Sequence, residues 1–503
     1  MRIASMKWNG WLGSRVLLVL CIGTALTGCA VGPDYRRPEA PKAQAYAPIP
    51  SSETTSAASG PGGEAQRLVT SMDIPGQWWT LFHSEPLNAL IDDALKHNAD
   101  VEAAHAALQV AWENVYAQRG AYFPSVSAGL NPTRQDVAKD LASPASSGAS
   151  LYSLTTAQVS VSYAPDLWGG TRRQVESAVA QANAQRFQLE ATYLTLTSNL
   201  VNAAIQEASL REQIKATQEI VSAQTQILDT LRRQQALGDV AESAVATQVA
   251  ALEQSRATLP PLEKQLAQQR DLLAALSGRT PDASIDATFE LAALQLPTEL
   301  PLSLPAQLVE QRPDVREADE QLHAASAGIG VAVANRLPNV QINATLGSAA
   351  EKTSSLFTAG TGFWSLGGNI TQPLFDGGSL KHKQRAAEAG YRQAAAQYRS
   401  TVLGAVQNVA DVLHAIRSDA DTLVAAERAE RAASRSLEIA RHQLSLGDIS
   451  QSVMLAAELA WQQSIIALAQ ARAARFADTV ALFQAVGGGW WHRDDTAEVS
   501  KAE

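Results

Sequence analysis

Cysteine, metal-binding clusters and nucleotide-binding loops are scarce or missing in this sequence of 503 residues. The two cysteines are Cys21 and Cys29, and the eight histidines are scattered, with no His-Glu-x-x-His and no Cys-x-x-Cys, so no metal site is predicted. The stretches 328–330 and 360–362 lack the third glycine of a dinucleotide-binding loop, and no Gly-Lys-Ser/Thr is present. Because no catalytic constellation is found, we expect a protein that is not an enzyme.

Basic charge and long apolar runs are also in short supply. Acidic residues number 50 against 40 basic ones, and the formal net charge of −10 gives no basic surface for nucleic acid. After Cys29 the sequence has no run of the roughly 18 apolar residues that a membrane-spanning helix needs. A chain of this kind that crosses a membrane must do so with strands.

The first 28 residues have the features of a signal peptide. A basic start is followed by the apolar run Val16–Leu26, which is too short to span a bilayer. Residues Leu26–Cys29 read Leu-Thr-Gly-Cys, the spacing of a bacterial lipobox. We expect cleavage before Cys29 and a covalent N-acyl diacylglycerol on that residue, with no other cofactor. The alternative is an ordinary secretory signal that happens to contain a cysteine.

The strongest internal signal is a tandem repeat of about 210 residues. Asp100-Val101 recurs as Asp314-Val315, the turn 237–240 (Leu-Gly-Asp-Val) recurs as 446–449 (Leu-Gly-Asp-Ile), and Gly278 recurs as Gly487. These landmarks keep the same order in both copies. The sequence therefore predicts a signal peptide at 1–28, a lipid-anchored N-terminal linker at 29–72, a first repeat at 73–290, a second repeat at 291–489 and a charged tail at 490–503. The Pro-, Ala-, Ser- and Gly-rich part of the linker, 36–72, is expected to be an extended tether.

Each repeat is predicted to contain a helix, two strands, a very long helix, a tight turn and a last helix. The first and last helices are expected at about 87–120 and 241–276 in repeat one, and at about 304–335 and 450–486 in repeat two. The long helices are expected at about 171–236 and 379–445. Some 66 residues at about 1.5 Å each make a rod of roughly 100 Å. The first and last helices of one repeat, placed end to end, match that length.

The four predicted strands alternate apolar and small polar residues. They are expected at about 124–133, 155–165, 338–347 and 363–373. In the first, Val126, Ala128 and Leu130 share one face. This alternation fits a soluble sheet or a lipid-facing barrel with a wet interior. Four strands cannot close a barrel alone, so a membrane barrel must be shared: two copies give eight strands and three copies give twelve.

The sequence resembles the TolC-like outer-membrane factors of tripartite efflux pumps with resistance-nodulation-division partners, specifically the lipoprotein branch. The resemblance is carried by 29–35 (Cys-Ala-Val-Gly-Pro-Asp-Tyr) with Pro38, 77–79 (Gln-Trp-Trp) with Phe82, 312–315 (Arg-Pro-Asp-Val) and 372–378 (Gln-Pro-Leu-Phe-Asp-Gly-Gly). It implies a mainly α fold with a small transmembrane β part. Each protomer would give four strands to a shared 12-stranded trimeric β-barrel that continues into a long periplasmic α-helical barrel.

The same resemblance implies a passive exit duct in the bacterial outer membrane for drugs or other small molecules. Its partners would be two further copies, a periplasmic adaptor (membrane fusion protein), an inner-membrane pump and outer-membrane lipid. A duct for type I protein secretion and a non-channel periplasmic coiled-coil lipoprotein remain as alternatives.

The resemblance also implies that the two Leu-Gly-Asp turns form a periplasmic tip that binds the adaptor and gates the entrance. Its candidate residues are Leu237, Gly238, Asp239, Leu446, Gly447 and Asp448. The simpler interpretation is that both glycines only end helices. Asp239 and Asp448 are expected to cap the helices that follow. Glu242 and Glu458 are candidate constriction residues, together with Asp448.

Overall fold

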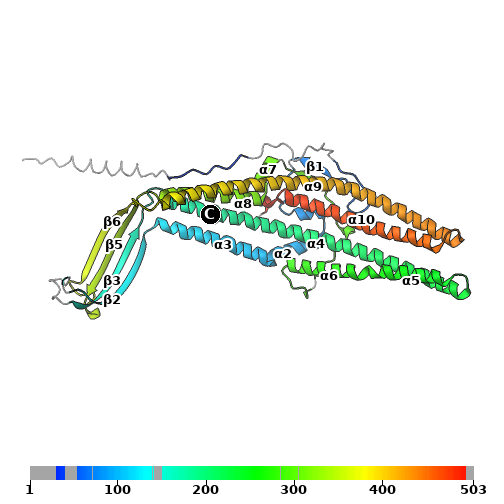
Figure 1. Ribbon diagram of the computed structural model, residues 1–503, viewed down its shortest axis with the longest axis horizontal. Coiled ribbons are helices and arrows are strands. Elements are labelled where there is room, and N and C mark those ends of the chain that lie inside the picture. The colour runs from blue at the N-terminus through cyan, green and yellow to red at the C-terminus, as the bar shows by residue number, and fades with distance from the viewer. Residues whose placement is uncertain are drawn as a thin grey trace, which may run out of the picture. The chain divides into compact units, whose positions relative to one another are not determined.

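The computed structural model describes residues 30–39, 54–70, 72–138, 140, 150–283, 285–303 and 305–493. The predicted signal peptide, Cys29, part of the linker and most of the tail lie outside these residues. The described chain divides into two compact units. A sheet unit takes its parts from Met1–Arg37, Gln109–Ala184 and Asp319–Gln397, and a helical unit from Pro38–Leu108, Gln185–Ala318 and Tyr398–Glu503. Figure 1 shows the elements of both units.

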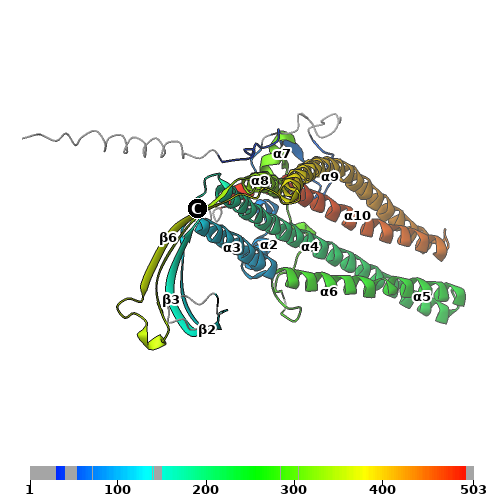
Figure 2. The same cartoon turned by 60° about the vertical axis from the view of Figure 1, so that its left-hand side comes forward.

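The sheet unit holds one four-stranded antiparallel sheet in the order β2-β3-β5-β6. Its strands are β2 (Ser125–Asp136), β3 (Leu151–Tyr163), β5 (Asn339–Ala350) and β6 (Gly362–Thr371). Each repeat supplies one hairpin, and β3 pairs with β5 to join the two hairpins. The strands run side by side as a curved ribbon (Figure 2). Strands β2 and β5 end later than predicted, and β3 begins earlier than predicted. Both hairpins are therefore longer than predicted at their loop ends.

The two long helices are α4 (Gly170–Leu237) and α9 (Ser379–Leu446), each 68 residues. No proline interrupts either helix. An aspartate caps the first turn of each one. The Asp166 carboxylate accepts the N–H groups of the residues at 171 and 172 at 3.0 and 2.8 Å, and Asp376 accepts those at 378 and 380, both at 2.8 Å. The carboxylates thus satisfy free N–H groups and face the positive end of the helix dipole.

The predicted single first helix of each repeat is wrong, because each is broken near its start. The structure has α2 (Glu85–His97) and α3 (Ala99–Arg119) in repeat one, and α7 (Pro305–Gln311) and α8 (Pro313–Ala334) in repeat two. Asn98 breaks the first one: its backbone is extended, and its side-chain oxygen accepts the N–H groups at 100 and 101. Pro313 restricts the residue before it in the second.

The last helix is also broken in repeat one but not in repeat two. Helix α5 (Glu242–Ala257) ends at Thr258, α6 (Leu259–Leu276) follows, and α10 (Gln451–Ala485) is continuous. Two prolines at 260 and 261 open α6, where their missing N–H groups cost nothing. The range 451–485 holds no proline, and this explains the difference.

The first and last helices of each repeat do meet end to end, as predicted. Asn98 donates its side-chain N–H to the carbonyl of Leu276 at 2.9 Å, and Arg312 donates to the carbonyl of Ala485 at 2.8 Å. The end of α6 therefore joins the start of α3, and the end of α10 joins the start of α8. The same joint is built twice, at positions that the repeat relates.

The predicted extended tether is wrong for residues 54–70, which pack within the helical unit. The buried guanidinium of Arg475 donates to the Thr55 hydroxyl at 3.0 Å and to the carbonyls of Ser56 and Glu64 at 3.2 and 2.6 Å. A buried cation needs such acceptors. Strand β1 (Arg67–Thr70) then pairs in parallel with β4 (Glu299–Leu302).

Helix α10 is long and apolar enough to cross a membrane by length and composition alone. It nevertheless buries charged groups at Arg475 and Glu458 within the helical unit. Its Phe483 ring stacks on Trp78 with centroids 5.3 Å apart, so the helix is part of a folded core. The remaining short elements are the 3₁₀ turns η1 (Trp78–Phe82), η2 (Gly120–Tyr122), η4 (Leu291–Ala293), η5 (Thr353–Ser355) and η6 (Trp490–His492).

Candidate functional site

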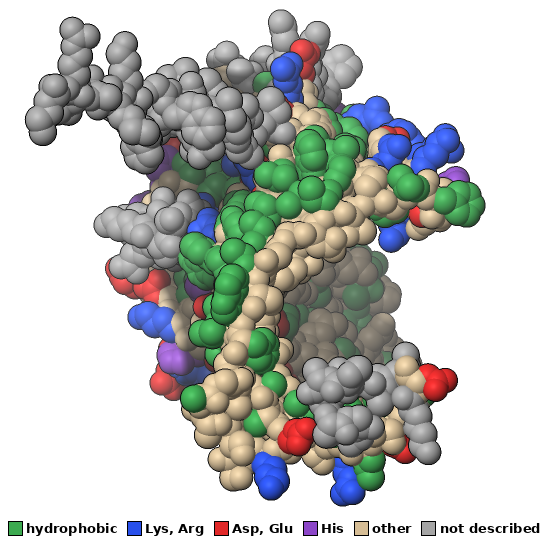
Figure 3. Space-filling model, turned by 90° about the vertical axis from the view of Figure 1, so that its left-hand side faces the viewer, with side chains coloured by type: hydrophobic (Ala, Val, Ile, Leu, Met, Phe, Trp, Pro, Cys, Tyr) green, Lys and Arg blue, Asp and Glu red, His purple; other side chains and the backbone are tan. Residues whose placement is uncertain are grey.

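One face of the four-stranded sheet is an exposed apolar surface. The register aligns Ala128, Val159, Leu346 and Trp364 in one row across the four strands. Trp364 is 76% exposed, and its neighbour two positions along the strand, Leu366, is 70% exposed. Figure 3 shows hydrophobic side chains gathered in a band on the side that faces the viewer. A contiguous exposed apolar surface of this kind marks a membrane or protein contact.

The opposite face of the same sheet is polar, and its two edges are open. Ser127, Ser160, Thr345 and Ser365 form one row on that face. Strands β2 and β6 each pair on one side only within the described part of the chain. Unpaired edges of 12 and 10 residues cannot lie in lipid, because each unsatisfied backbone group costs several kcal/mol there. If the sheet lies in a membrane, both edges require a pairing partner.

The two Leu-Gly-Asp turns are helix C-caps of the same Schellman type. Gly447 N–H bonds to the carbonyl at 444 and Asp448 N–H to the carbonyl at 443, both at 3.0 Å, and Gly238 and Asp239 repeat this arrangement at 2.9 Å. Gly238 has φ +82° and Gly447 has φ +80°. Among the residues that the structure describes, no other atom lies within 4 Å of a Cβ added at either glycine. Glycine is thus required by the backbone conformation and not by lack of space.

The expected capping role of Asp239 and Asp448 is wrong. The next helices have Ala241 and Ser450 as their N-cap residues, and neither makes a side-chain capping bond. Both aspartates instead belong to the preceding turn. Leu237 is 78% and Leu446 is 63% exposed beside these turns. Two leucines exposed at capped turns are available for contact with a partner.

Each turn connects two helices into a hairpin, α4 with α5 and α9 with α10. The two hairpins contact each other near the turns. Gln451 donates to the side-chain oxygen of Gln248 at 3.0 Å, and Gln248 donates to the carbonyl of Gln224 at 3.3 Å. Ile227 of α4 packs against the buried cluster around Met454 of α10. The contacts tie α4 and α5 to α10.

The candidate constriction residues differ in exposure. Glu242 lies in the first turn of α5 and is exposed, as is Asp448. Glu458 is 1% exposed and lies 3.7 Å from Arg441, and burial raises the pKa of its carboxyl above the ordinary value. Its burial argues against Glu458 as a residue that lines a pore.

The segment Ala30–Arg37 contains most of the N-terminal motif identified from the sequence. It packs within the sheet unit. Arg173 of α4 bridges the carboxylates of Asp34 and Glu176, at 2.7 Å each. The ion pair with Arg173 holds the pKa of Asp34 below its ordinary value. A Cβ on Gly169 would lie 2.7 Å from the Cα of Ala30, so the chain touches the start of α4 directly.

The second half of this segment contacts α8. The Tyr35 ring stacks on His323 with centroids 4.4 Å apart, and its hydroxyl bonds to the Asp319 carboxylate. Arg37 donates to the same carboxylate at 2.7 Å. The Glu320 carboxylate is the main cause that raises the pKa of His323. No local sequence pattern predicts these contacts, since Tyr35 and Arg37 are 284 and 282 residues away from Asp319 in sequence.

Comparison with known proteins identifies the class. The family model "Outer membrane efflux protein" matches residues 90–279 and 304–488, one match in each repeat, and the chain belongs to this family. It is the outer-membrane channel component of an efflux system and not an enzyme. The resemblance inferred from the sequence is thereby confirmed, and the non-channel alternative is wrong.

The relatives cover nearly the whole chain. It is 28% identical over 475 residues to "Probable efflux pump outer membrane protein TtgC" of Pseudomonas putida, covering 94% of this chain and 95% of the relative. It is 27% identical over 491 residues to "Probable outer membrane lipoprotein SilC" of Salmonella typhimurium, covering 94% and 99%. The solved structure of the outer-membrane channel OprN superposes with a TM-score of 0.81 at 26% identity, covering 92% of this chain and all of that one.

Proposed function

We propose that three copies of this chain close a 12-stranded barrel in the outer membrane. The observation that carries the proposal is a sheet with an exposed apolar face and two unpaired edge strands, β2 and β6. Pairing β6 of one copy with β2 of the next leaves no open edge in lipid. Two copies would give only eight strands, and the family resemblance favours three.

The polar face of the sheet then lines the interior of the barrel, and the long helices of the three copies form the wall of a periplasmic tube. The duct is passive and exports small molecules. A periplasmic adaptor engages the exposed turns at Leu237–Asp239 and Leu446–Asp448, and through it an inner-membrane resistance-nodulation-division pump supplies the energy. The Pseudomonas putida relative, described as a probable efflux pump outer membrane protein, supports the role in efflux.

The chain is further proposed to be anchored to the membrane through lipid on Cys29. The lipobox spacing supports the anchor, and so does the Salmonella typhimurium relative described as a lipoprotein. Ala30, the next residue, touches Gly169 at the start of α4, six residues after β3 ends at Tyr163. The bound segment would therefore hold the lipid near a strand end, where the membrane boundary lies.

Native mass measurement of the purified protein in detergent tests the oligomer, and three copies are expected. A stable monomer with full β content would contradict the shared barrel. Mass analysis of the mature N-terminus tests the anchor separately. An unmodified Cys29 in protein recovered from the outer membrane would refute the lipid but not the channel.

A further inference from the structure

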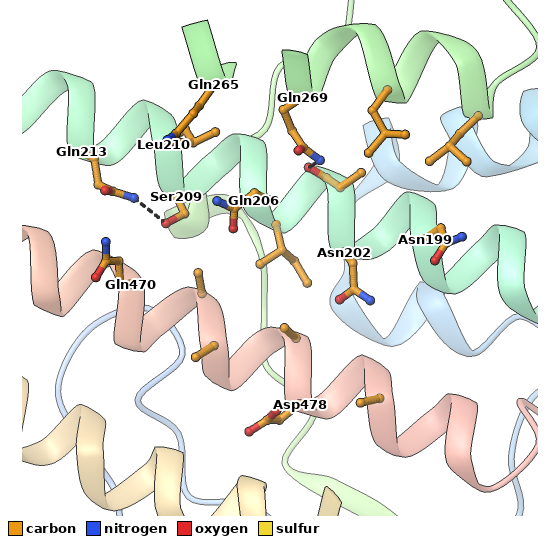
Figure 4. A pocket seen from close by; sticks show the side chains of 18 residues that line it. Asn199, Asn202, Gln206, Ser209, Leu210, Gln213, Gln265, Gln269, Gln470 and Asp478 are labelled. Carbon is orange, nitrogen blue, oxygen red and sulfur yellow. Dashed lines mark hydrogen bonds between the residues drawn. The ribbon is translucent and has the colours of Figure 1, made fainter. Parts of the chain in front are cut away.

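A cavity of about 870 Å³ lies between α4, α6 and α10 in the helical unit. Figure 4 shows side chains from all three helices directed toward it. Its volume is in the range of sites that bind drug-sized molecules. The contacts described above, at the turns and at the sheet, do not involve it.

Carboxamide side chains dominate the polar lining. Seven asparagines and glutamines line the cavity, among them Asn202 and Gln206 on α4, Gln269 on α6 and Gln470 on α10. No lysine or arginine is among the lining residues. Asp478, the one ionisable lining residue, lies at the edge, and its side chain points away from the α4 amides (Figure 4). The lining therefore offers both donors and acceptors but no cation for an anion to pair with.

Part of this hydrogen-bonding capacity is unused. The side-chain oxygen of Asn202 is buried without a hydrogen-bond partner. Gln269 donates one N–H to the carbonyl of Ala203 at 3.2 Å, and Gln213 donates one to the Ser209 hydroxyl at 3.1 Å. A carboxamide has two donors and an acceptor, so both glutamines keep groups to offer. The Asn202 oxygen is closed to solvent, so the exposed amides of Gln206, Gln265 and Gln470 are the groups that can meet a ligand.

Small and apolar residues form the remaining wall. Ala473, Ala474, Ala477 and Ala481 line the cavity from α10, and leucines line it from α4 and α6. At 100° per residue these alanines lie on the side of α10 opposite Arg475 and Thr479, which bind the packed segment 54–66. The cavity thus opens on the free face of this helical layer. In the proposed tube, that face is the interior.

We propose that this cavity is a binding site for neutral or cationic small molecules that carry hydrogen-bond donors and an apolar face, as they pass through the duct. The inference rests on the proposed channel function. Amide oxygens of the exposed glutamines accept from the donors of the ligand, while the alanines and leucines receive its apolar face. Anions are disfavoured because no basic side chain lines the site.

Equilibrium dialysis of ethidium against the purified full-length channel in dodecyl maltoside tests the site, with empty micelles as the blank. Ethidium is a planar cation with two amino groups. Placing a phenyl ring in the cavity with Ala477→Phe should block part of the site and weaken ethidium binding at least about tenfold. Ala460→Phe, at an exposed alanine of the same helix, is the matched control and should leave binding unchanged. Gln206→Leu keeps the volume, removes one amide and should weaken binding about fivefold.

Fluorescein, a dianion of similar size, should bind at least about tenfold more weakly than ethidium. Equal ethidium binding by Ala477→Phe and the parent would overturn the assignment to this cavity. Fluorescein binding as tight as that of ethidium would overturn the ligand class. Ion conductance in planar bilayers distinguishes failure of the binding site from failure of the channel function. A conducting channel that binds no ethidium refutes the site alone, whereas a protein that neither conducts nor binds refutes the proposed function.

Discussion

Glycine-to-alanine substitution at two helix ends should have very different costs, although the two glycines have the same conformation. Gly278 has φ +73° and Gly447 has φ +80°, and each ends a helix with the same pair of backbone bonds. A Cβ on Gly278 would lie 2.2 Å from the carbonyl oxygen of His97. A Cβ on Gly447 would meet no atom within 4 Å. The pair therefore separates the cost of the conformation from the cost of the joint between α6 and α3.

The conformational cost is common to both sites. An alanine in the left-handed region costs about 1 kcal/mol, and Gly447→Ala should cost no more than that. At Gly278 the methyl group must also move a backbone carbonyl by about 1 Å to reach ordinary contact. Overpacking of this kind costs roughly 1–3 kcal/mol more, so Gly278→Ala should destabilise the protein by about 2–4 kcal/mol.

Thermal unfolding of the two variants in detergent, followed by circular dichroism at matched protein concentration, measures the difference. Gly487→Ala provides the replicate in the second repeat, because its Cβ would lie 2.4 Å from the carbonyl oxygen of Gln311. It should behave like Gly278→Ala. Equal losses at all three positions would refute the conclusion that these end-to-end joints are tightly packed.

Three further predictions concern a helix cap, a buried acid and the tip. Asp376→Ala should lower the stability of α9 by about 1 kcal/mol in thermal unfolding, because two N–H groups lose their acceptor, and Asp376→Asn should recover part of it. Burial, together with Asp419, raises the pKa of Asp478 to about 7, so the folded chain holds this proton more tightly than the unfolded chain. The contribution of Asp478 to stability therefore falls as pH rises from about 4 to 7. Asp478→Asn should therefore raise the unfolding midpoint more at pH 8 than at pH 5, and equal gains would contradict the buried acid. Gly447→Val should keep the oligomer but reduce drug efflux and adaptor crosslinking, and wild-type levels of both would leave the turn as a cap only.

The sheet was the part of the fold most accessible from the sequence. Period-two alternation fixes which residues share a face, and Val126 and Ala128 do lie on the apolar one. The predicted starts of β2, β5 and β6 agree with the structure to within one residue. The far end of β2 was less predictable, because its pairing continues through Arg134 and Asp136, which break the alternation.

Some breaks in the helices have a cause that is visible in the sequence, and others have a cause that the sequence hides. The break before α6 has a visible cause in the prolines at 260 and 261, which the single predicted helix 241–276 overlooked. The break at Asn98 is hidden, since asparagine is tolerated within helices and the side chain here combines local bonds to the N–H groups at 100 and 101 with one bond to the end of α6, 178 residues away in sequence. The packing of Thr55 and Glu64 around Arg475 is hidden in the same way, because a Ser- and Gly-rich segment has the composition of a tether.

The candidate tip illustrates why residue type predicts turns better than it predicts exposure. The Leu-Gly-Asp turns were recognisable because only glycine adopts the left-handed conformation without strain. Glu458 has the residue type expected of an acidic constriction, yet helix α10 turns it toward Arg441 and away from solvent. Its direction depends on how α9 and α10 pack, which no local pattern encodes. The two joints add the complementary case: Asn98 and Arg312 differ in type, yet the repeat places each where a side-chain donor meets a carbonyl at the end of the last helix of its own repeat. Position within the duplicated architecture, more than residue identity, therefore determines what these side chains do.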